Sequence, residues 1–297
     1  MPEYAVLDKD TIKIWIMLYL SVAKRGYTSK FDLPEIVNAI LHKLRSGCRW
    51  RFLPLGHLFS GEPPSWNTVF RHYRKWCVKD EWRKAYANAV NQDKAALDLS
   101  LSHMDGSHTP ALRGGECVGY QGRKKRRTTN GLFFTDDQGI PLAMSDPEAG
   151  NHADLHEIKD RVNEIAEQPE DAGIFTDGLF CNLDAGFDGN DLRVALDSHG
   201  IISNVCPNRR NRGQPTEERL FDEEMYKERW KIERTNAWID GFRNVLVRFD
   251  TTISSWKGWN FLTFIVIFLK KFTNQISLNN FNKKIRTSKF LLYFFID

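Results

Sequence analysis

In the first third of the chain, apolar residues recur every three or four positions, which places them on one face of an α-helix. Three segments show this pattern, and each follows a residue that can cap a helix: 34–46 after Asp32, 66–76 after Ser65 and 82–90 after Asp80. A loop rich in Gly and Pro separates the first two segments. The pattern predicts a compact helical unit over residues 1–95.

The spacing changes near residue 97, where Leu97, Leu99 and Leu101 alternate with polar residues. This two-residue period predicts a strand that ends at Asp105. Further strands are expected in TTNGLFFTDD, GIPLAMSD, GIFTDGLFCNLDA and IISNVCP, with helices between the later ones. A hairpin group followed by alternating strands and helices predicts an α/β (α+β) domain over residues 96–272, with a mixed β-sheet flanked by helices.

The end of the chain contains the most apolar run, residues 259–269. It is shorter than the ~20 residues that span a bilayer, so we interpret it as a buried core helix and expect no membrane segment. Residues 273–297 lose clear periodicity and are expected to form a tail. The N-terminus lacks a signal-peptide pattern, and the five scattered cysteines are interpreted as reduced thiols of a cytosolic protein.

The formal net charge is only +4, but the positive charge is locally concentrated. Two dense runs consist of Arg123, Lys124, Lys125, Arg126 and Arg127, and of Arg209, Arg210 and Arg212. Such runs fit contact with the phosphates of nucleic acid, although a solvated loop is the alternative for each.

The second predicted helix also has a basic side, formed by Arg71, Arg74 and Lys75. This side fits a helix that enters a DNA groove, as in a helix-turn-helix protein. A structural helix with an exposed basic face is the alternative.

Three acidic residues are the candidates for chemistry. Asp105 and Asp184 each follow an apolar, strand-like run, whereas Glu233 lies in a predicted helix and shares one face with Tyr226 and Arg229. Phosphoryl transfer by two metal ions needs a few carboxylates, delivered from distant segments of the chain. The three acids are predicted to form such a site.

Each acid also has a simpler interpretation. Asp105 precedes a glycine, as in an ordinary turn, and Asp177 competes with Asp184 for the second position. Asp188 or Asn190 is expected to cap a helix that runs through residue 199. Glu233 has basic neighbours and could form a surface ion pair.

Two other groups of residues are considered and set aside. His152 and His156 have a spacing that can bind zinc on a helix, but no third ligand is evident, so solvated histidines at a helix N-terminus are expected. Ser107 and His108 lie next to Asp105, and adjacent residues rarely converge into a catalytic triad. The sequence contains no phosphate-binding glycine loop of nucleotide enzymes.

Several stretches taken together resemble the insertion sequence 5 family of transposases. They are NAILHKLRSGCRWRFLP, PSWNTVFRHYRKW, DGSH, RGGE, GYQGRKKRRTTN, GIPLAMS with GNHADLHEI, DAGFD, NRRNRG and YKERWKIERTNAWIDGFRNVLVRFD. The resemblance covers roughly residues 30–270, and the combination is specific where no single stretch would be.

The resemblance implies a DDE transposase with a ribonuclease H-like catalytic core. It matches Asp105, Asp184 and Glu233 to the three acids of that family, and it favours Asp184 over its competitor because of the DAGFD turn. Tyr226 and Arg229 occupy their places in the family's Tyr-x2-Arg-x3-Glu-x6-Lys signature. The final Lys position of that signature holds Asp240, and Arg243, one turn further on, could substitute for the missing base.

The resemblance also implies what the protein acts on. It implies cleavage at element ends and strand transfer into target DNA, with two Mg²⁺ ions, or Mn²⁺, as cofactors. It further implies double-stranded DNA as the partner, a homodimer on that DNA, and a bacterial protein at the nucleoid in the cytoplasm. The alternatives are an inactive or domesticated relative that only binds DNA, and a plain metal-dependent nuclease.

Overall fold

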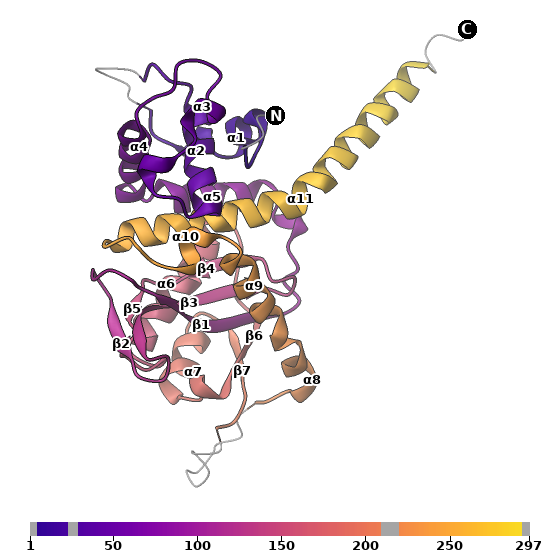
Figure 1. Ribbon diagram of the computed structural model, residues 1–297. Helices are drawn as coiled ribbons and strands as arrows, with labels where there is room; N and C mark the ends of the chain where they lie inside the picture. The colour runs from indigo at the N-terminus through magenta and orange to yellow at the C-terminus, as the bar shows by residue number, and fades with distance from the viewer. Residues whose placement is uncertain (1–4, 23–28, 209–219, 293–297) are drawn as a thin grey trace.

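The computed structural model describes residues 5–22, 29–208 and 220–292, with side chains described as far as Phe272. Figure 1 shows a group of helices from the start of the chain on one side and a sheet with flanking helices on the other. The helices of the first part are α1 Lys9–Trp15, α2 Leu33–Ser46, α3 Leu55–Leu58, α4 Trp66–Val78 and α5 Glu81–Gln92. The three helices predicted from periodicity are therefore confirmed as α2, α4 and α5.

The ends of these helices follow local rules with two exceptions. Ser65 caps α4, because its side chain accepts a hydrogen bond from the Thr68 amide. Gly47 ends α2 with a φ of 68°, a left-handed conformation that glycine adopts without strain. Asp32 and Asp80 occupy the N-cap positions of α2 and α5, as predicted, but their side chains make no capping hydrogen bond.

The second part is built on one mixed sheet. Its strands are β1 Ser102–Pro110, β2 Gly119–Gln121, β3 Arg126–Asp136, β4 Pro141–Met144, β5 Glu148–Ala149, β6 Phe180–Leu183 and β7 Ile202–Val205. They run in the order β2-β3-β1-β6-β7, and β4 and β5 also pair with β3. The pairs β1–β3, β2–β3, β3–β4 and β3–β5 are antiparallel, whereas β1–β6 and β6–β7 are parallel. This is the predicted mixed sheet, in which an antiparallel group precedes parallel strands.

The first strand does not begin where the sequence predicted. The alternating leucines 97, 99 and 101 precede β1, which runs from Ser102 to Pro110, so Asp105 lies inside the strand and not at its end. Leu97 and Leu99 instead pack against the core from outside the sheet. A polar segment can form the central strand because all nine of its residues pair with β3, which provides its backbone groups with hydrogen-bond partners.

Helices cover the sheet and complete the core. They are α6 Ile158–Asp171, α7 Asn190–Asp197, α8 Glu223–Tyr226, α9 Trp230–Asp240, α10 Arg243–Leu246 and α11 Ile253–Leu292. Within α11 the apolar run 259–269 is almost entirely buried, which confirms a core helix. The backbone of α11 continues through Leu292, so the helix includes most of the segment that was expected to be a tail. In the part of the chain that the structure describes, no helix is long and apolar enough to cross a membrane.

The last helix connects the two parts of the molecule. Figure 1 shows α11 running between the N-terminal helices and the sheet. The ring of Trp259 in α11 stacks on Tyr73 of α4 at a centroid distance of 4.0 Å, and the Tyr73 hydroxyl donates to the Ser255 carbonyl at 2.5 Å. On the sheet side, the ring of Phe264 packs against Phe133 of β3. One continuous apolar core therefore includes residues from both parts.

Candidate active site

Two neighbouring parallel strands bring Asp105 and Asp184 to one level of the sheet. The last register pair of β1 and β6 is His103 with Asn182, and each acid lies two residues further along its own strand direction. Since side chains alternate between the faces of a strand, an equal offset of two places both carboxylates on the same side. Asp184 follows β6 directly, as predicted.

The helical segment from α8 to α9 brings the third acid to this place. Asn236 of α9 donates from Nδ2 to Asp105 Oδ2 at 3.4 Å. Glu233 lies one helical turn before Asn236, on the same side of α9. Its Oε1 accepts a hydrogen bond from Arg229 Nη2 at 2.7 Å, so the signature residues Arg229 and Glu233 are paired. The structure thus brings the three predicted acids to one region.

The charges in this region are not balanced. Burial raises the pKa of Asp105 to about 6, the Arg229 guanidinium opposes this shift, and the negative charge of Asp184 adds to it. The amide of Gly106 donates to Asp105 Oδ1 at 2.9 Å and offsets a part of the effect. Ionising one carboxylate beside another in a buried place is costly, and a bound cation reduces this cost. The two acids therefore form a site that attracts a cation.

Tyr226 and Arg229 line the same region. Burial is the main cause that raises the pKa of Tyr226, while the charge of Arg229 lowers it and that of Asp184 raises it further. The Tyr226 ring packs edge-on against Phe221 at a centroid distance of 5.3 Å. The side chain therefore packs against a neighbouring ring and also lies near the charged groups.

Sequence reasoning did not identify Asp154, which lies beside the three acids. Its Oδ1 accepts a hydrogen bond from Asn130 Nδ2 at 3.0 Å and lies 3.8 Å from His108 Nε2. Asp154 Oδ1 also lies close to β1, since a Cβ atom on Gly106 would be 3.3 Å from it. No local signal marks this residue, because its contact with β1 is purely tertiary. Asn236, also missed, could have been found from its i+3 spacing to Glu233.

The competing acids occupy other places. Asp177 lies before β6 and beside Gly200, at the opposite end of the strand from Asp184. Asp188 does not cap α7, whose N-cap is Gly189, so that prediction is wrong. The Asp188 carboxylate instead accepts hydrogen bonds from Arg193 Nη2 at 3.1 Å and from the amide of Asn208 at 2.9 Å, and it fixes the connection after β7.

The two histidines also differ from the prediction. His152 and His156 lie in the loop before α6 and not on the helix, because α6 begins only at Ile158. A third group does meet them, since the carboxylate of Glu148 in β5 lies 3.0 Å from His152 Nδ1 and 3.4 Å from His156 Nδ1. The expected absence of a third ligand is therefore wrong, because strand β5 and the loop come together only in the fold.

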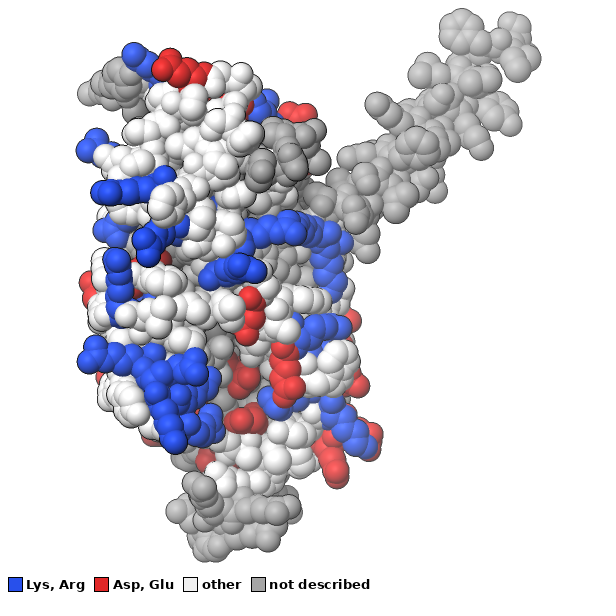
Figure 2. All heavy atoms as spheres, in the orientation of Figure 1, with Lys and Arg blue, Asp and Glu red and all other residues white. Residues whose placement is uncertain are grey.

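A dense basic patch lies beside the acids. It consists of Arg123, Lys124, Lys125, Arg126 and Arg127, which are all exposed at the β2–β3 hairpin. Figure 2 shows this concentration of Lys and Arg, with acidic groups between it and the helices α8 and α9. Burial raises the pKa of Asp240, and the charge of Lys124 opposes that shift, so the end of α9 lies near the patch. The other basic run, with Arg209, Arg210 and Arg212, lies outside the described residues.

The basic side of α4 is largely used within the molecule. Arg74 Nη1 donates to Thr252 Oγ1 and Ser255 Oγ, both at 2.8 Å, and Lys75 Nζ donates to the Ser21 carbonyl at 3.0 Å. Of the three residues that were expected to contact DNA from this helix, only Arg71 is exposed. The helix thus has less free basic surface than its sequence indicates.

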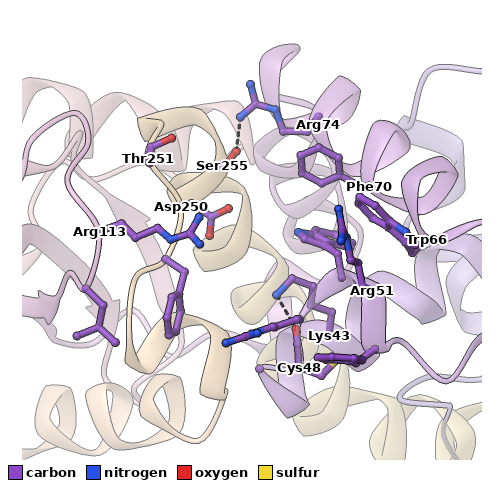
Figure 3. A pocket seen from close by; sticks show the side chains of 16 residues that line it. Lys43, Cys48, Arg51, Trp66, Phe70, Arg74, Arg113, Asp250, Thr251 and Ser255 are labelled. Carbon is purple, nitrogen blue, oxygen red and sulfur yellow. Dashed lines mark hydrogen bonds between the residues drawn. The ribbon is translucent and has the colours of Figure 1, made fainter.

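A large pocket lies between α2, α4 and the start of α11. Its volume is about 1020 Å³, and Figure 3 shows basic and aromatic side chains around it. They include Arg51, Arg74 and Arg113 together with Trp66 and Phe70. The Arg51 guanidinium lies over the Trp66 ring at 5.3 Å from its centroid. Arginine beside aromatic rings is the lining that binds the phosphates and bases of single-stranded nucleic acid.

The fold is a mixed sheet flanked by helices, with Asp105 in β1, Asp184 directly after the parallel strand β6 and Glu233 in the helix α9. Carboxylates gathered from distant segments in this way suit an enzyme of metal-dependent phosphoryl transfer. Two family models then match the sequence. The model described as "Putative transposase of IS4/5 family" matches residues 16–86, and that described as "Transposase DDE domain" matches residues 95–269. The second match covers more than half of the chain, which therefore belongs to the transposase DDE domain family, a family of enzymes that cleave DNA and transfer strands.

Solved structures with a similar arrangement are distant. The "Mos1 transposase paired-end complex with left transposon end" is 12% identical, with 82% of this chain and 80% of that chain covered and a TM-score of 0.27. The "Crystal structure of the Mos1 Strand Transfer Complex" is 11% identical, with 83% and 79% covered and the same TM-score. Such a TM-score is too low for residues to be compared one by one. No curated protein matches this sequence.

Proposed function

We propose that Asp105, Asp184 and Glu233 form the catalytic centre of this transposase and hold divalent metal ions, Mg²⁺ or Mn²⁺. The observation that carries this proposal is the equal offset of Asp105 and Asp184 on the parallel strands β1 and β6. The donor set fits, since Mg²⁺ prefers carboxylate oxygens. Burial is the main cause that raises the pKa of Asp105, and the negative charge of Asp184 adds to it, so a bound cation would stabilise the ionised form of Asp105. When bound, two such ions activate an oxygen nucleophile and stabilise the leaving oxygen of the phosphodiester.

Three neighbouring side chains prepare this centre. Asn236 orients the Asp105 carboxylate through its hydrogen bond to Oδ2. Arg229 holds Glu233 and keeps a fixed positive charge near Asp105, and its planar guanidinium can contact a DNA phosphate with two parallel hydrogen bonds. Tyr226 offers its hydroxyl to a phosphate or its ring to an unpaired base at the same place.

DNA contact is assigned to the basic patch and to the basic aromatic pocket. The patch, residues 123–127, lies beside the proposed catalytic centre and can bind several phosphates. The pocket next to α4 is suited to a stretch of single-stranded DNA. Arg243 is exposed at the start of α10, one turn beyond Asp240, and takes the place of the missing basic residue. Arg209, Arg210 and Arg212 are assigned to DNA contact on their sequence alone.

We assign the helical unit of residues 1–95 to DNA binding and residues 96–272 to catalysis, with residues 273–297 as a separate C-terminal part. Element ends must be brought together for transposition, so a homodimer on DNA is expected, acting at the nucleoid of a bacterial cell. Light scattering of the protein with and without DNA of the element end tests this assembly. A strict monomer in both samples would contradict the dimer.

The decisive experiment is a Mg²⁺-dependent cleavage assay on DNA with the element's own ends. Wild type is compared with Asp184→Asn and Glu233→Gln, and binding of the same DNA is measured for each protein. Cleavage by wild type alone, with equal binding by all three, supports the proposed centre. Strand-transfer products separate a transposase from a plain nuclease.

One observation favours a second candidate function, a relative that binds DNA without cutting it. At position 240 the family signature has a lysine. This chain has Asp240 there, which puts a negative charge near Lys124. Binding of end DNA without cleavage by wild type, under any divalent metal, would support this second function.

A further inference from the structure

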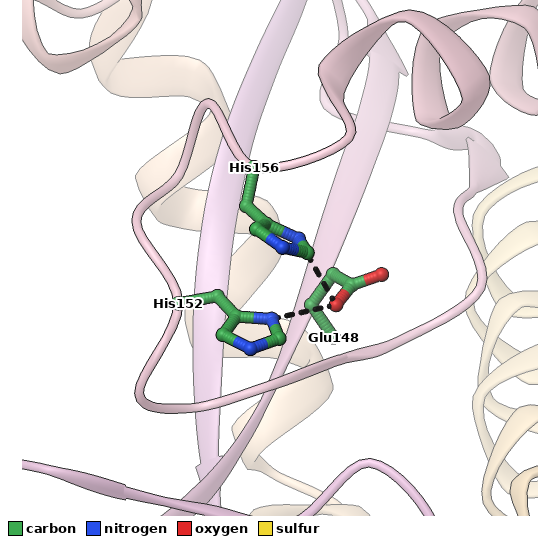
Figure 4. A group of neighbouring side chains, drawn as sticks. All are labelled: Glu148, His152 and His156. Atoms are coloured by element: carbon green, nitrogen blue, oxygen red, sulfur yellow. Dashed lines mark hydrogen bonds and ion pairs between the residues drawn. The ribbon is translucent and has the colours of Figure 1, made fainter.

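A second group of metal-binding side chains lies apart from the three acids. It consists of Glu148 at the start of β5 and of His152 and His156 in the following loop, as Figure 4 shows. One donor atom from each residue lies within 4.8 Å of the other two. The two imidazole rings stack with their centroids 3.8 Å apart, so they are already turned toward one carboxylate.

The separations between the donor atoms fit a small tetrahedral ion. Zinc ligands lie about 2.0–2.1 Å from the ion, so neighbouring ligands in a tetrahedron are roughly 3.3 Å apart. The distances from Glu148 Oε2 to the Nδ1 atoms of His152 and His156 are 3.0 and 3.4 Å. All three donor atoms lie within 4.8 Å of one another, so side-chain shifts of at most about 1.5 Å bring them to this spacing.

The hydrogen bonding of the group is incomplete without an ion. Nδ1 of His156 is buried and has no hydrogen-bond partner, although it lies 3.4 Å from the Glu148 carboxylate. A buried polar atom without a partner costs about 1–3 kcal/mol. A lone pair of Nδ1 that is directed at a cation removes this deficit.

The chemistry of the ligands selects the metal. Two imidazole nitrogens and one carboxylate suit zinc and related transition metals, while Mg²⁺ prefers oxygen ligands alone. The side chains of Glu148, His152 and His156 are 17, 33 and 38% exposed, so an ion at this position keeps access to water. A site with three protein ligands and one water is complete for zinc.

The position of the group in the fold indicates what the ion would do. Asp154 lies midway between the two histidines in the same loop, and its carboxylate touches β1 beside Gly106. We propose that Glu148, His152 and His156 bind a zinc-class transition-metal ion, which ties this loop to β5 and thereby holds Asp154 next to the three-acid site. The ion is a positioning element, independent of the metal ions of catalysis, and Asp154 is a positioning residue.

The test is a metal titration of the full chain that carries Asp184→Asn, so that binding at the three-acid site is weakened. Co²⁺ is followed by its visible absorption, and Zn²⁺ by competition with Co²⁺. One equivalent is expected to bind to this parent protein. Loss of an outer hydrogen bond to a ligand already weakens metal binding by about 10–100-fold, so loss of a ligand should weaken it by at least about 100-fold.

Three variants of the parent protein remove one ligand each: Glu148→Gln, His152→Ala and His156→Ala. His199→Ala is the matched control, because His199 pairs with Asn163 at the surface, away from this group. Retained Co²⁺ affinity in all three ligand variants, or the absence of stoichiometric binding to the parent protein, would overturn the proposal. Glu148→Gln keeps a polar group of the same size, so it serves even if a histidine variant fails to fold.

A second readout concerns the loop itself. Zn²⁺ should slow the amide hydrogen exchange of residues 150–157 in the parent protein by at least about tenfold and leave the Glu148→Gln variant unchanged. If Zn²⁺ binds but exchange in this loop does not change, the positioning role is refuted. Failure of either test leaves the proposed catalytic centre unaffected, because that centre is tested by DNA cleavage.

Discussion

Arg229 donates from its guanidinium to the Glu233 carboxylate over 2.7 Å, and the two residues lie one helical turn apart. The Glu233 side chain is 61% exposed, whereas that of Arg229 is 21% exposed. An ion pair with such an exposed member contributes about 0–1 kcal/mol to stability. The pair is therefore better explained by positioning, since it fixes the direction of Glu233 and keeps a positive charge near Asp105.

Removing this guanidinium should change how activity depends on pH. The charge of Arg229 lowers the pKa of Asp105, so Arg229→Ala should raise that pKa further above about 6. Metal binding and cleavage would then need a higher pH, and the acidic limb of the cleavage profile should move upward. The profile of kcat against pH, measured at saturating Mg²⁺, checks this shift.

The matched controls for this change are Arg229→Lys and Lys227→Ala. Arg229→Lys keeps the charge, so its profile should shift less than that of Arg229→Ala. Lys227 pairs with Glu224 on the exposed side of the same segment, and its loss should leave the profile in place. Equal shifts in all three variants would contradict the assigned role of Arg229.

The stability of the metal-free protein should also depend on Asp105. Its folded-state pKa of about 6 lies above the ordinary value of 3.8, so between these values the folded protein binds more protons than the unfolded chain. Its contribution to stability is thus fully present below about pH 4 and is lost as pH rises through 6. The loss is at most about 3 kcal/mol, from roughly two pKa units at 1.36 kcal/mol each.

Asp105→Asn removes the part of the pH dependence of stability that comes from Asp105. The free energy of unfolding, measured with denaturant in EDTA at pH 4.5 and pH 7, tests this. The pKa of Asp136 is also raised to about 6, mainly by burial, so the wild-type curve contains both effects. Only the difference between wild type and the variant reports on Asp105. An identical pH dependence of stability in the two proteins would show that the pKa of Asp105 is not raised in the folded protein.

The basic patch should dominate the salt dependence of DNA binding. Replacing Arg123, Lys124 and Lys125 by Gln should reduce the slope of log K against log salt by up to about 0.9 for each phosphate contact that is lost. Binding titrations between 50 and 200 mM salt, conditions in which such contacts weaken strongly, give this slope. Replacing Lys159, which pairs with Asp191 outside the N-terminal unit, should leave the slope unchanged.

Asp240 should weaken contact with DNA. Its carboxylate lies near Lys124 and competes with phosphate for that charge. Asp240→Asn should therefore tighten binding of end DNA by up to about fivefold, as expected for an exposed charge worth up to about 1 kcal/mol. Asp240→Lys should tighten it further.

The control for this change is Asp191→Asn, which removes an exposed acid that pairs with Lys159 outside the N-terminal unit. Equilibrium binding at fixed salt checks both variants. Weaker binding by Asp240→Lys would mean that the acid itself has a role in this protein, against the assigned substitution by Arg243.

The sequence predicted the elements that follow simple periodicity. α2, α4 and α5 were found because their buried residues recur at helical spacing, and the burial of α11 followed from its unbroken apolar run. β1 was placed too early, because the leucines before it alternate by packing outside the sheet while its own residues are polar. Local patterns carry no information on a polar strand that is paired on both sides.

The candidate site was predicted only in part for the same reason. Asp105, Asp184 and Glu233 were predicted from their places after strand-like runs and on a helix face, and the family resemblance then favoured Asp184 over Asp177, since each acid taken alone is an ordinary turn or helix residue. Asp154 and Glu148 gain their importance from contacts with segments far away in the sequence, with Asn130 and with two histidines. Such contacts depend on how β3, β5 and the loop before α6 pack, which no spacing rule describes.

The position of α11 has a consequence for the order in which the protein is made. Trp50 and Tyr73 of the N-terminal part pack against Trp259 of α11, so the core of the helices that are synthesised first is completed only by one of the last segments. A nascent chain that stops before α11 presents these aromatic rings to solvent. The N-terminal helical unit should therefore fold fully only after the sheet has been synthesised, and a product shortened before α11 should be a target for proteases.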